Sequence, residues 1–218
     1  MWARAFVLPR AVPVAMLFCA LASEGGAQPV LPGLRIVPLA EGPGDDCHPY
    51  FSREEADRLY RVWDSQIDSG NTEVFLRQRS RGVSGWGESI RLSKNPCLDQ
   101  FPAVAIFRDD PIVVWETQGE HSFELVFCRH DSVGWSLPQS IRRDEIDDRH
   151  PTHWRYPPCL NGKPWLVLAW ERAGQLYWGE YGGEDWRIVG PVAPQSGVQR
   201  NAFLLADFLS RGEVLFIA

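Results

Sequence analysis

The chain has 218 residues, of which 44% are hydrophobic and 12% are aromatic, and its formal net charge at pH 7 is −6. This length and apolar content are sufficient for a packed globular core. The acidic charge, without a basic stripe, excludes binding to a phosphate backbone, so we expect no nucleic acid partner. A neutral or cationic partner suits such a chain better.

Residues 1–27 have the pattern of a secretory signal peptide. Arg4 and Arg10 precede an apolar run at 11–22, which is followed by small residues that offer cleavage sites. The run is shorter than the ~20 residues that a membrane-spanning helix needs. We therefore expect a secreted or periplasmic protein without a membrane span. Its mature part, 28–218, keeps 20 basic and 27 acidic residues, a net charge of −7.

Four sequence markers recur three times in the same order, 49 to 55 residues apart. The first is Asp-x-x-Pro, which begins at Asp46, Asp99 and Asp148. The second is a Trp followed by an acid, at Trp63-Asp64, Trp115-Glu116 and Trp170-Glu171. The third opens an apolar run at Glu73, Glu124 and Gln175, and the fourth is Trp86, Trp135 and Trp186. A period of this length is typical of repeat proteins.

The segments between the markers are short, rich in β-branched and aromatic residues, and bounded by Gly, Asp, Asn or Pro, as strands and tight turns are. We expect four antiparallel strands per repeat: after the Pro, before the first Trp, from the Glu or Gln, and from the last Trp. Such a sheet buries both faces only between neighbours, so the sequence predicts an all-β fold of β-propeller-type blades. A β-sandwich has no reason to repeat these markers in register.

About three and a half blades fit into the chain. We place them at about 46–94, 95–145 and 146–195, with a partial blade at 196–218, and expect an N-terminal strand at 34–39. Three explanations stay open for this blade number. They are a small, imperfectly closed four-bladed ring, a homodimer that completes a ring of about seven blades, and a truncated larger propeller.

The markers, together with the turn Trp135-Ser136-Leu137-Pro138, resemble the sialidase-type, BNR-repeat (Asp-box-like) β-propeller superfamily across residues 34–218. The Asp-box of that family is present in a degraded form at 130–135. The resemblance implies the propeller fold. Sialidases also use three arginines, a Tyr–Glu pair and an Asp acid/base, and none of these groups can be assigned to positions of this chain. The chain therefore resembles a non-catalytic or truncated member, and its catalytic residues are unknown.

One face of the predicted blades collects polar side chains, because the connections before the first strand and after the second strand emerge on the same side. The candidate ligand-binding residues there are Asp46, His48, Asp99, Asp148, His150, Asp64, Glu116 and Glu171. Carboxylates and imidazoles can receive a polyhydroxylated or cationic ligand. The alternative, which the recurrence of the Asp favours, is that each Asp accepts N–H bonds in its own turn. We assign no metal and no cofactor.

Four cysteines remain after export, an even number that suits disulfides in an oxidising compartment: Cys47, Cys97, Cys128 and Cys159. Cys47 and Cys97 lie in equivalent connections of successive blades, and we expect a disulfide between them.

The function that these patterns favour is a secreted propeller-type binding or scaffold module without an assigned catalytic residue. Its expected ligand is a carbohydrate or a protein. The alternative is a sialidase-like glycoside hydrolase, or a truncated remnant of one.

Overall fold

The computed structural model describes residues 45–52, 57–156, 165–192, 203–207 and 213–217. The predicted signal peptide and the predicted strand at 34–39 lie outside these residues. Every regular element in the described part of the chain is a β-strand, which confirms the all-β prediction. No helix in that part is long and apolar enough to cross a membrane.

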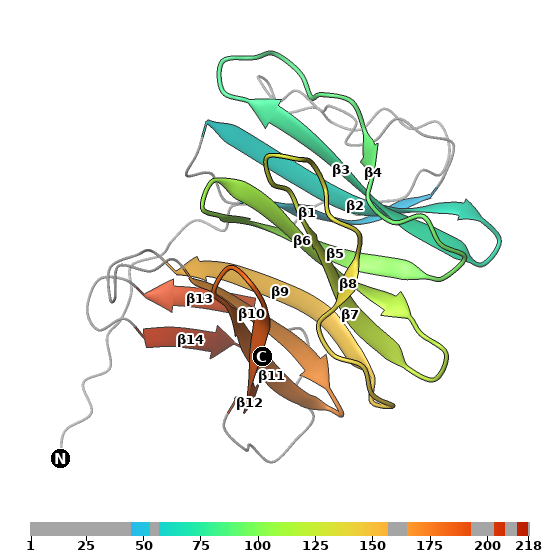
Figure 1. Ribbon diagram of the computed structural model, residues 1–218, viewed down its shortest axis with the longest axis vertical. Helices are drawn as coiled ribbons and strands as arrows, with labels where there is room; N and C mark the ends of the chain where they lie inside the picture. The colour runs from blue at the N-terminus through green and yellow to red at the C-terminus, as the bar shows by residue number, and fades with distance from the viewer. Residues whose placement is uncertain (1–44, 53–56, 157–164, 193–202, 208–212, 218) are drawn as a thin grey trace, which may run out of the picture. The chain divides into compact units, whose positions relative to one another are not determined.

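The strands form three four-stranded antiparallel sheets and one hairpin, in chain order (Figure 1). The first sheet consists of β1 (Asp46–Phe51), β2 (Arg58–Asp68), β3 (Asn71–Ser80) and β4 (Ile90–Arg91). The second consists of β5 (Asp99–Phe107), β6 (Asp110–Gln118), β7 (Phe123–Arg129) and β8 (Gln139–Ser140). The third consists of β9 (Asp148–Tyr156), β10 (Trp165–Arg172), β11 (Gln175–Tyr181) and β12 (Trp186–Pro191). The hairpin pairs β13 (Phe203–Asp207) with β14 (Glu213–Ile217). This meander order confirms the predicted blades.

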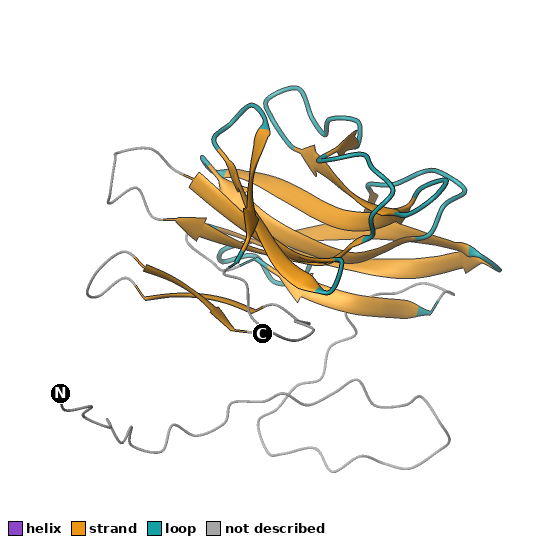
Figure 2. Ribbon diagram, turned by 90° about the horizontal axis from the view of Figure 1, so that it is seen from below, coloured by secondary structure: helices purple, strands orange, loops and turns teal. Residues whose placement is uncertain are grey.

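The three sheets pack face to face, so that two apolar layers separate them (Figure 2). Val62 and Leu76 of the first sheet meet Val104 and Trp115 of the second in one layer. The second layer joins the other face of the second sheet to the third sheet. Each fully buried Val, Leu or Ile contributes about 1.5–3 kcal/mol, so these layers supply most of the stabilisation.

The position of the second sheet between the other two explains why the sequences of its strands are continuous apolar runs. Val104 and Ile106 of β5 face the first sheet, whereas Ala105 and Phe107 face the third. The same alternation divides 112–115 in β6 between the two layers. Because successive side chains of a strand point to opposite faces, a strand with both faces covered must be apolar at every position.

The fourth strand of a blade differs from the prediction in two blades of three. β12 begins at Trp186 as expected, but β4 and β8 begin four residues after Trp86 and Trp135 and have only two residues each. In the second blade a tight turn at 131–134 precedes the tryptophan, and Asp131 Oδ1 accepts the N–H groups of Val133 and Gly134 in it. Trp135 then forms only an isolated bridge with His130. Glycine at a φ of 132° closes that turn, so the strand starts later.

A side-chain hydrogen bond within each blade explains why the repeat Asp and the first repeat Trp recur together. The indole Nε1–H of Trp63 donates to Asp46 at 3.1 Å, that of Trp115 to Asp99 at 3.0 Å, and that of Trp170 to Asp148 at 2.8 Å. Each bond joins the first residue of a blade's first strand to its second strand. The Asp therefore accepts an indole N–H of its own blade, which replaces the predicted bonds to turn N–H groups.

We expect Trp115→Phe to lower the free energy of unfolding by about 1–3 kcal/mol, because the buried Asp99 carboxylate loses a donor while most of the ring volume stays. Urea unfolding measures the change. Trp135→Phe is the matched control, since no hydrogen bond of its indole is present in the described part of the protein. An equal loss in both variants would contradict a special role of the indole–carboxylate bond.

Candidate functional site

The residue before each repeat proline has a left-handed backbone. The φ angles of His48, Phe101 and His150 are 45°, 52° and 50°. The pairing of the first and second strands shifts register at the same place in each blade, which is a β-bulge. A bulged residue leaves the ladder, so its N–H needs an acceptor elsewhere.

The acceptor comes from the preceding blade. Asp64 Oδ2 accepts the N–H of Phe101 at 2.8 Å, and Glu116 Oε2 accepts the N–H of His150 at 2.9 Å. Asp64 and Glu116 are the acids that follow the repeat Trp, and both are buried. We call the boundary between two neighbouring blades a seam and these two bonds the seam bonds, because each joins one blade to the next at the equivalent repeat position.

The three bulged side chains stack on one another. The rings of His48 and Phe101 have centroids 3.7 Å apart, and those of Phe101 and His150 are 4.5 Å apart in an edge-to-face arrangement. The side chain of His48 is 39% exposed and that of His150 36%, so the stack is open to solvent on one side. It brings together one predicted candidate from each of the first and third blades.

Each acid that follows a repeat Trp has a cationic or imidazole group nearby. His48 Nδ1 lies 2.7 Å from Asp64, and His150 Nδ1 lies 3.2 Å from Glu171. In the middle blade Phe101 replaces the histidine, and Arg149 of the next blade approaches Glu116 at 3.3 Å instead. The sequence reasoning missed Phe101 and Arg149; the repeat position marked Phe101, whereas no spacing marked Arg149.

The second and third repeat Asp residues are buried and committed to internal contacts. Asp99 accepts hydrogen bonds from Trp115 and from the Asn95 amide. Asp148 accepts one from Trp170, and Arg172 Nη1 donates to both of its carboxylate oxygens at 2.9 Å. Arg172 is buried and was also missed by the sequence reasoning. Four of the predicted acids, Asp64, Asp99, Glu116 and Asp148, are therefore buried and hold the blades. The other candidates, Asp46, His48, His150 and Glu171, are exposed or half-buried.

Three buried carboxyls have raised pKa values, and in Asp148 burial outweighs the hydrogen bonds and the charge of Arg172. Burial raises the pKa of Asp99 above its ordinary value, against the hydrogen bonds that it accepts. Burial also raises the pKa of Glu116, against the His150 N–H and the Arg149 charge. Between the ordinary and the raised pKa, the folded protein holds a proton that the unfolded chain has lost, so stability falls as the pH rises.

We expect the melting temperature to fall as the pH rises from 4.5 to 7, and to fall less in Asp99→Asn, which removes one of the titrating groups. Calorimetry over this pH range measures both slopes. Parallel curves for the two proteins would show that Asp99 does not titrate in this window.

We expect Glu116→Ala to lower the free energy of unfolding by about 2–4 kcal/mol, because the bulged N–H of His150 and Arg149 lose their acceptor. Glu116→Gln should cost only about 1 kcal/mol, since the amide oxygen can still accept the N–H. The exposed Glu120→Ala, which should change stability by less than about 0.5 kcal/mol, is the control in chemical denaturation. Equal costs for the Ala and Gln variants would contradict the seam bond.

The cysteines do not add a reactive group to this face. Cys97 and Cys128 are thiols in the structure, so the predicted Cys47–Cys97 disulfide is not formed there and stays a prediction. Burial raises the pKa of Cys128, and burial with the nearby Asp99 and Glu73 carboxylates raises that of Cys97. A thiol with a raised pKa is a poor nucleophile.

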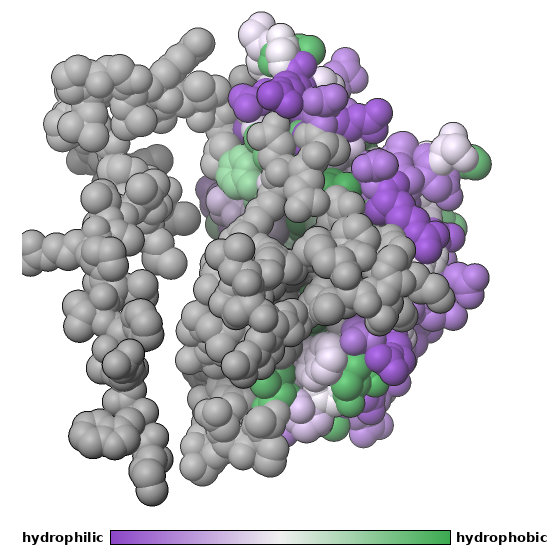
Figure 3. Space-filling model, turned by 90° about the vertical axis from the view of Figure 1, so that its left-hand side faces the viewer, coloured by the Kyte–Doolittle hydropathy of each residue, from purple (hydrophilic) through white to green (hydrophobic). Residues whose placement is uncertain are grey.

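No group of three or more His, Cys, Asp or Glu side chains in the described part is placed to hold a metal ion. On the side shown in Figure 3, the described surface is mainly hydrophilic, with apolar residues scattered over it. Scattered apolar residues are normal for a protein surface.

No protein-family model and no curated protein matches the chain. The solved structures that it is similar to include the hemagglutinin-neuraminidase ectodomain of parainfluenza virus 5, at 12% sequence identity. That match covers 67% of this chain and 32% of that chain, with a TM-score of 0.45. The sialidase of Trypanosoma rangeli in complex with sialic acid is 10% identical, and the match covers 82% of this chain and 34% of that chain with a TM-score of 0.49. The same sialidase with the inhibitor DANA is 9% identical, and the match covers 69% of this chain and 29% of that chain with a TM-score of 0.42.

The chain spans about a third of the length of these structures. At such identities and scores the likeness concerns the fold alone. The propeller-type assignment of this chain rests on its own sheets, their meander order and the two apolar layers between them.

Proposed function

We propose that the protein is a secreted propeller-type binding or scaffold module, with the stack of His48, Phe101 and His150 as its binding surface. One observation carries the proposal. Five of the six candidate carboxylates, those of Asp46, Asp64, Asp99, Glu116 and Asp148, accept indole or backbone N–H groups within the fold. The row of three rings is therefore open to a ligand beside the exposed Asp46 and the half-buried Glu171.

The chemistry of the stack favours a neutral, polyhydroxylated ligand or a protein side chain. Imidazoles whose Nδ1 faces a carboxylate keep the Nε2 position for a hydrogen bond to a hydroxyl or carbonyl group. Phe101 adds an apolar contact between them. Hydrolysis of a glycoside needs two carboxyl groups that are available to the substrate, so the burial of Asp64, Asp99, Glu116 and Asp148 supports binding over the hydrolase alternative.

The test uses the exported protein. Expression of the full chain should give a secreted or periplasmic product whose N-terminal sequence begins near Gln28. Light scattering of this product tells whether a homodimer completes the ring. An immobilised panel of glycans and secreted proteins then identifies what the product retains.

We expect His48→Ala combined with His150→Ala to weaken the retained interaction at least about tenfold, since two ligand hydrogen bonds are lost. Surface plasmon resonance measures the affinity, with Glu120→Ala as the control. Unchanged binding by the double variant would refute the ring stack as the binding surface. Cleavage of fluorogenic glycosides by the wild-type protein would favour the hydrolase instead.

A further inference from the structure

The first sheet differs from the other two on one face. In the second sheet, the cross-strand pair Val113 and Cys128 lies in the apolar layer that meets the first sheet. In the third sheet, Leu168 has the equivalent place in the next layer. In the first sheet the equivalent cross-strand pair is Arg61 and Arg77. Two arginines therefore stand where the second blade has an apolar pair.

Aromatic rings hold the arginines on this face. Because Val62 lies in the layer against the second sheet, its neighbour Arg61 points to the opposite face. The guanidinium carbon of Arg61 is 4.3 Å from the centroid of the Trp86 ring and 5.5 Å from that of Trp63. The guanidinium carbon of Arg79 is 5.6 Å from the Trp86 centroid. A ring face attracts a cation at these distances. We call this surface the basic face.

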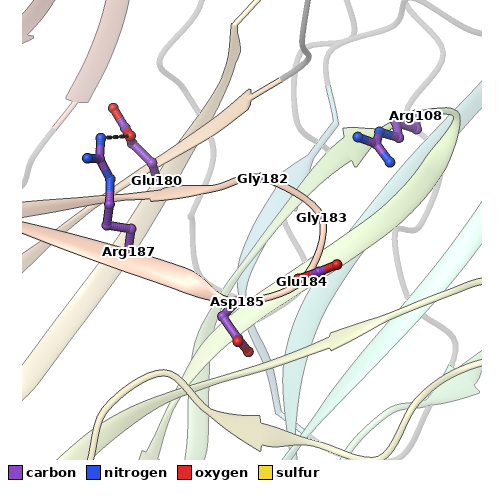
Figure 4. Close-up of a pocket in the computed structure, with 7 residues that line it drawn as sticks. All are labelled: Arg108, Glu180, Gly182, Gly183, Glu184, Asp185 and Arg187. Atoms are coloured by element: carbon purple, nitrogen blue, oxygen red, sulfur yellow. Dashed lines mark hydrogen bonds and ion pairs between the residues drawn. The ribbon is translucent and has the colours of Figure 1, made fainter.

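Two of these arginines have no carboxylate partner in the described part of the chain, Arg77 and Arg79. In the β11–β12 hairpin, by contrast, Arg187 forms an ion pair with Glu180, as the dashed line in Figure 4 shows. The buried Nε–H of Arg77 has no hydrogen-bond acceptor among the described residues. A buried charged donor without an acceptor destabilises a fold, so an anion beside Arg77 would stabilise this one.

The cross-strand register increases the attraction for an anion. Arg61 and Arg77 lie directly opposite each other in β2 and β3, and like charges in that position repel. The chain as a whole has a net charge of −6, so the basic face is a local exception. Such a patch steers an acidic partner to one place on an otherwise acidic surface.

The spacing of Arg77 and Arg79 fits an extended segment. They lie two positions apart in β3, so their side chains share one face about 7 Å apart. Phe51 is 41% exposed, and its ring centroid is 6.2 Å from that of Trp86, which adds an apolar contact surface. We propose that the basic face binds an extended acidic segment of a partner protein, with carboxylates at alternate positions on Arg77 and Arg79.

This surface is separate from the ring stack. The stacked rings lie at the beginning of β1, β5 and β9, whereas Arg77 and Arg79 lie near the end of β3. Variants of the basic face therefore test this proposal and leave the ring stack intact.

The test titrates the peptide acetyl-Val-Glu-Val-Glu-Val-amide into the isotope-labelled mature protein. Chemical shift changes should concentrate at the Nε–H groups of Arg77 and Arg79 and at the indole N–H of Trp86. The isomer acetyl-Val-Glu-Glu-Val-Val-amide has the same charge, but its carboxylates point to opposite sides of an extended chain. It should bind about fivefold more weakly, because one charged contact is lost.

Arg77→Gln combined with Arg79→Gln separates binding from folding. The double variant should keep or raise the melting temperature, because the repulsion from Arg61 is removed, and should bind the peptide at least about tenfold more weakly. The exposed Arg79→Gln alone should weaken binding about fivefold, and the exposed Arg143→Gln is the control that should bind normally. The proposal is overturned if the peptide does not bind, if its isomer binds equally well, or if the Arg79→Gln variant binds as the wild type does.

Discussion

The hydrogen bond from a bulged N–H to the buried acid of the preceding blade is the constraint on which the arrangement of the sheets depends. Apolar layers supply most of the stabilisation, but they are not directional. The Asp64–Phe101 and Glu116–His150 bonds are directional, and the bulged groups have left their ladders. They therefore fix the height at which one blade meets the next, and they place the three rings in one row.

The period of the sequence was enough to predict the four-stranded blades and the face on which the acids gather. It was not enough to predict which group each acid meets, because a repeat shows equivalence and not proximity. The Asp99–Trp115 bond lies within one blade, whereas Glu116 reaches into the next. The late start of β4 and β8 also escaped prediction, and for β8 the turn around Gly134 overrode the position of the tryptophan.

The repeated and the unrepeated residues have different roles. Asp, Trp and the following acid occur in every blade and act as internal ties. Arg149 occurs once, at the repeat position of Cys47 and Gln100, and it reaches Glu116 across the seam. In a repeat protein the shared positions carry the architecture, so departures from the repeat are where recognition can develop without loss of the fold.

The phenylalanine in the middle of the ring stack makes the two seams unequal. Because Phe101 cannot neutralise Glu116, the counter-charge comes from Arg149 across the seam, and Arg129 adds two further bonds between the same two blades. At the other seam, His48 Nδ1 lies 2.7 Å from Asp64 within the first blade, so this contact does not cross the seam. The second seam therefore has arginine contacts at both ends of its strands in addition to the bond that the repeat supplies.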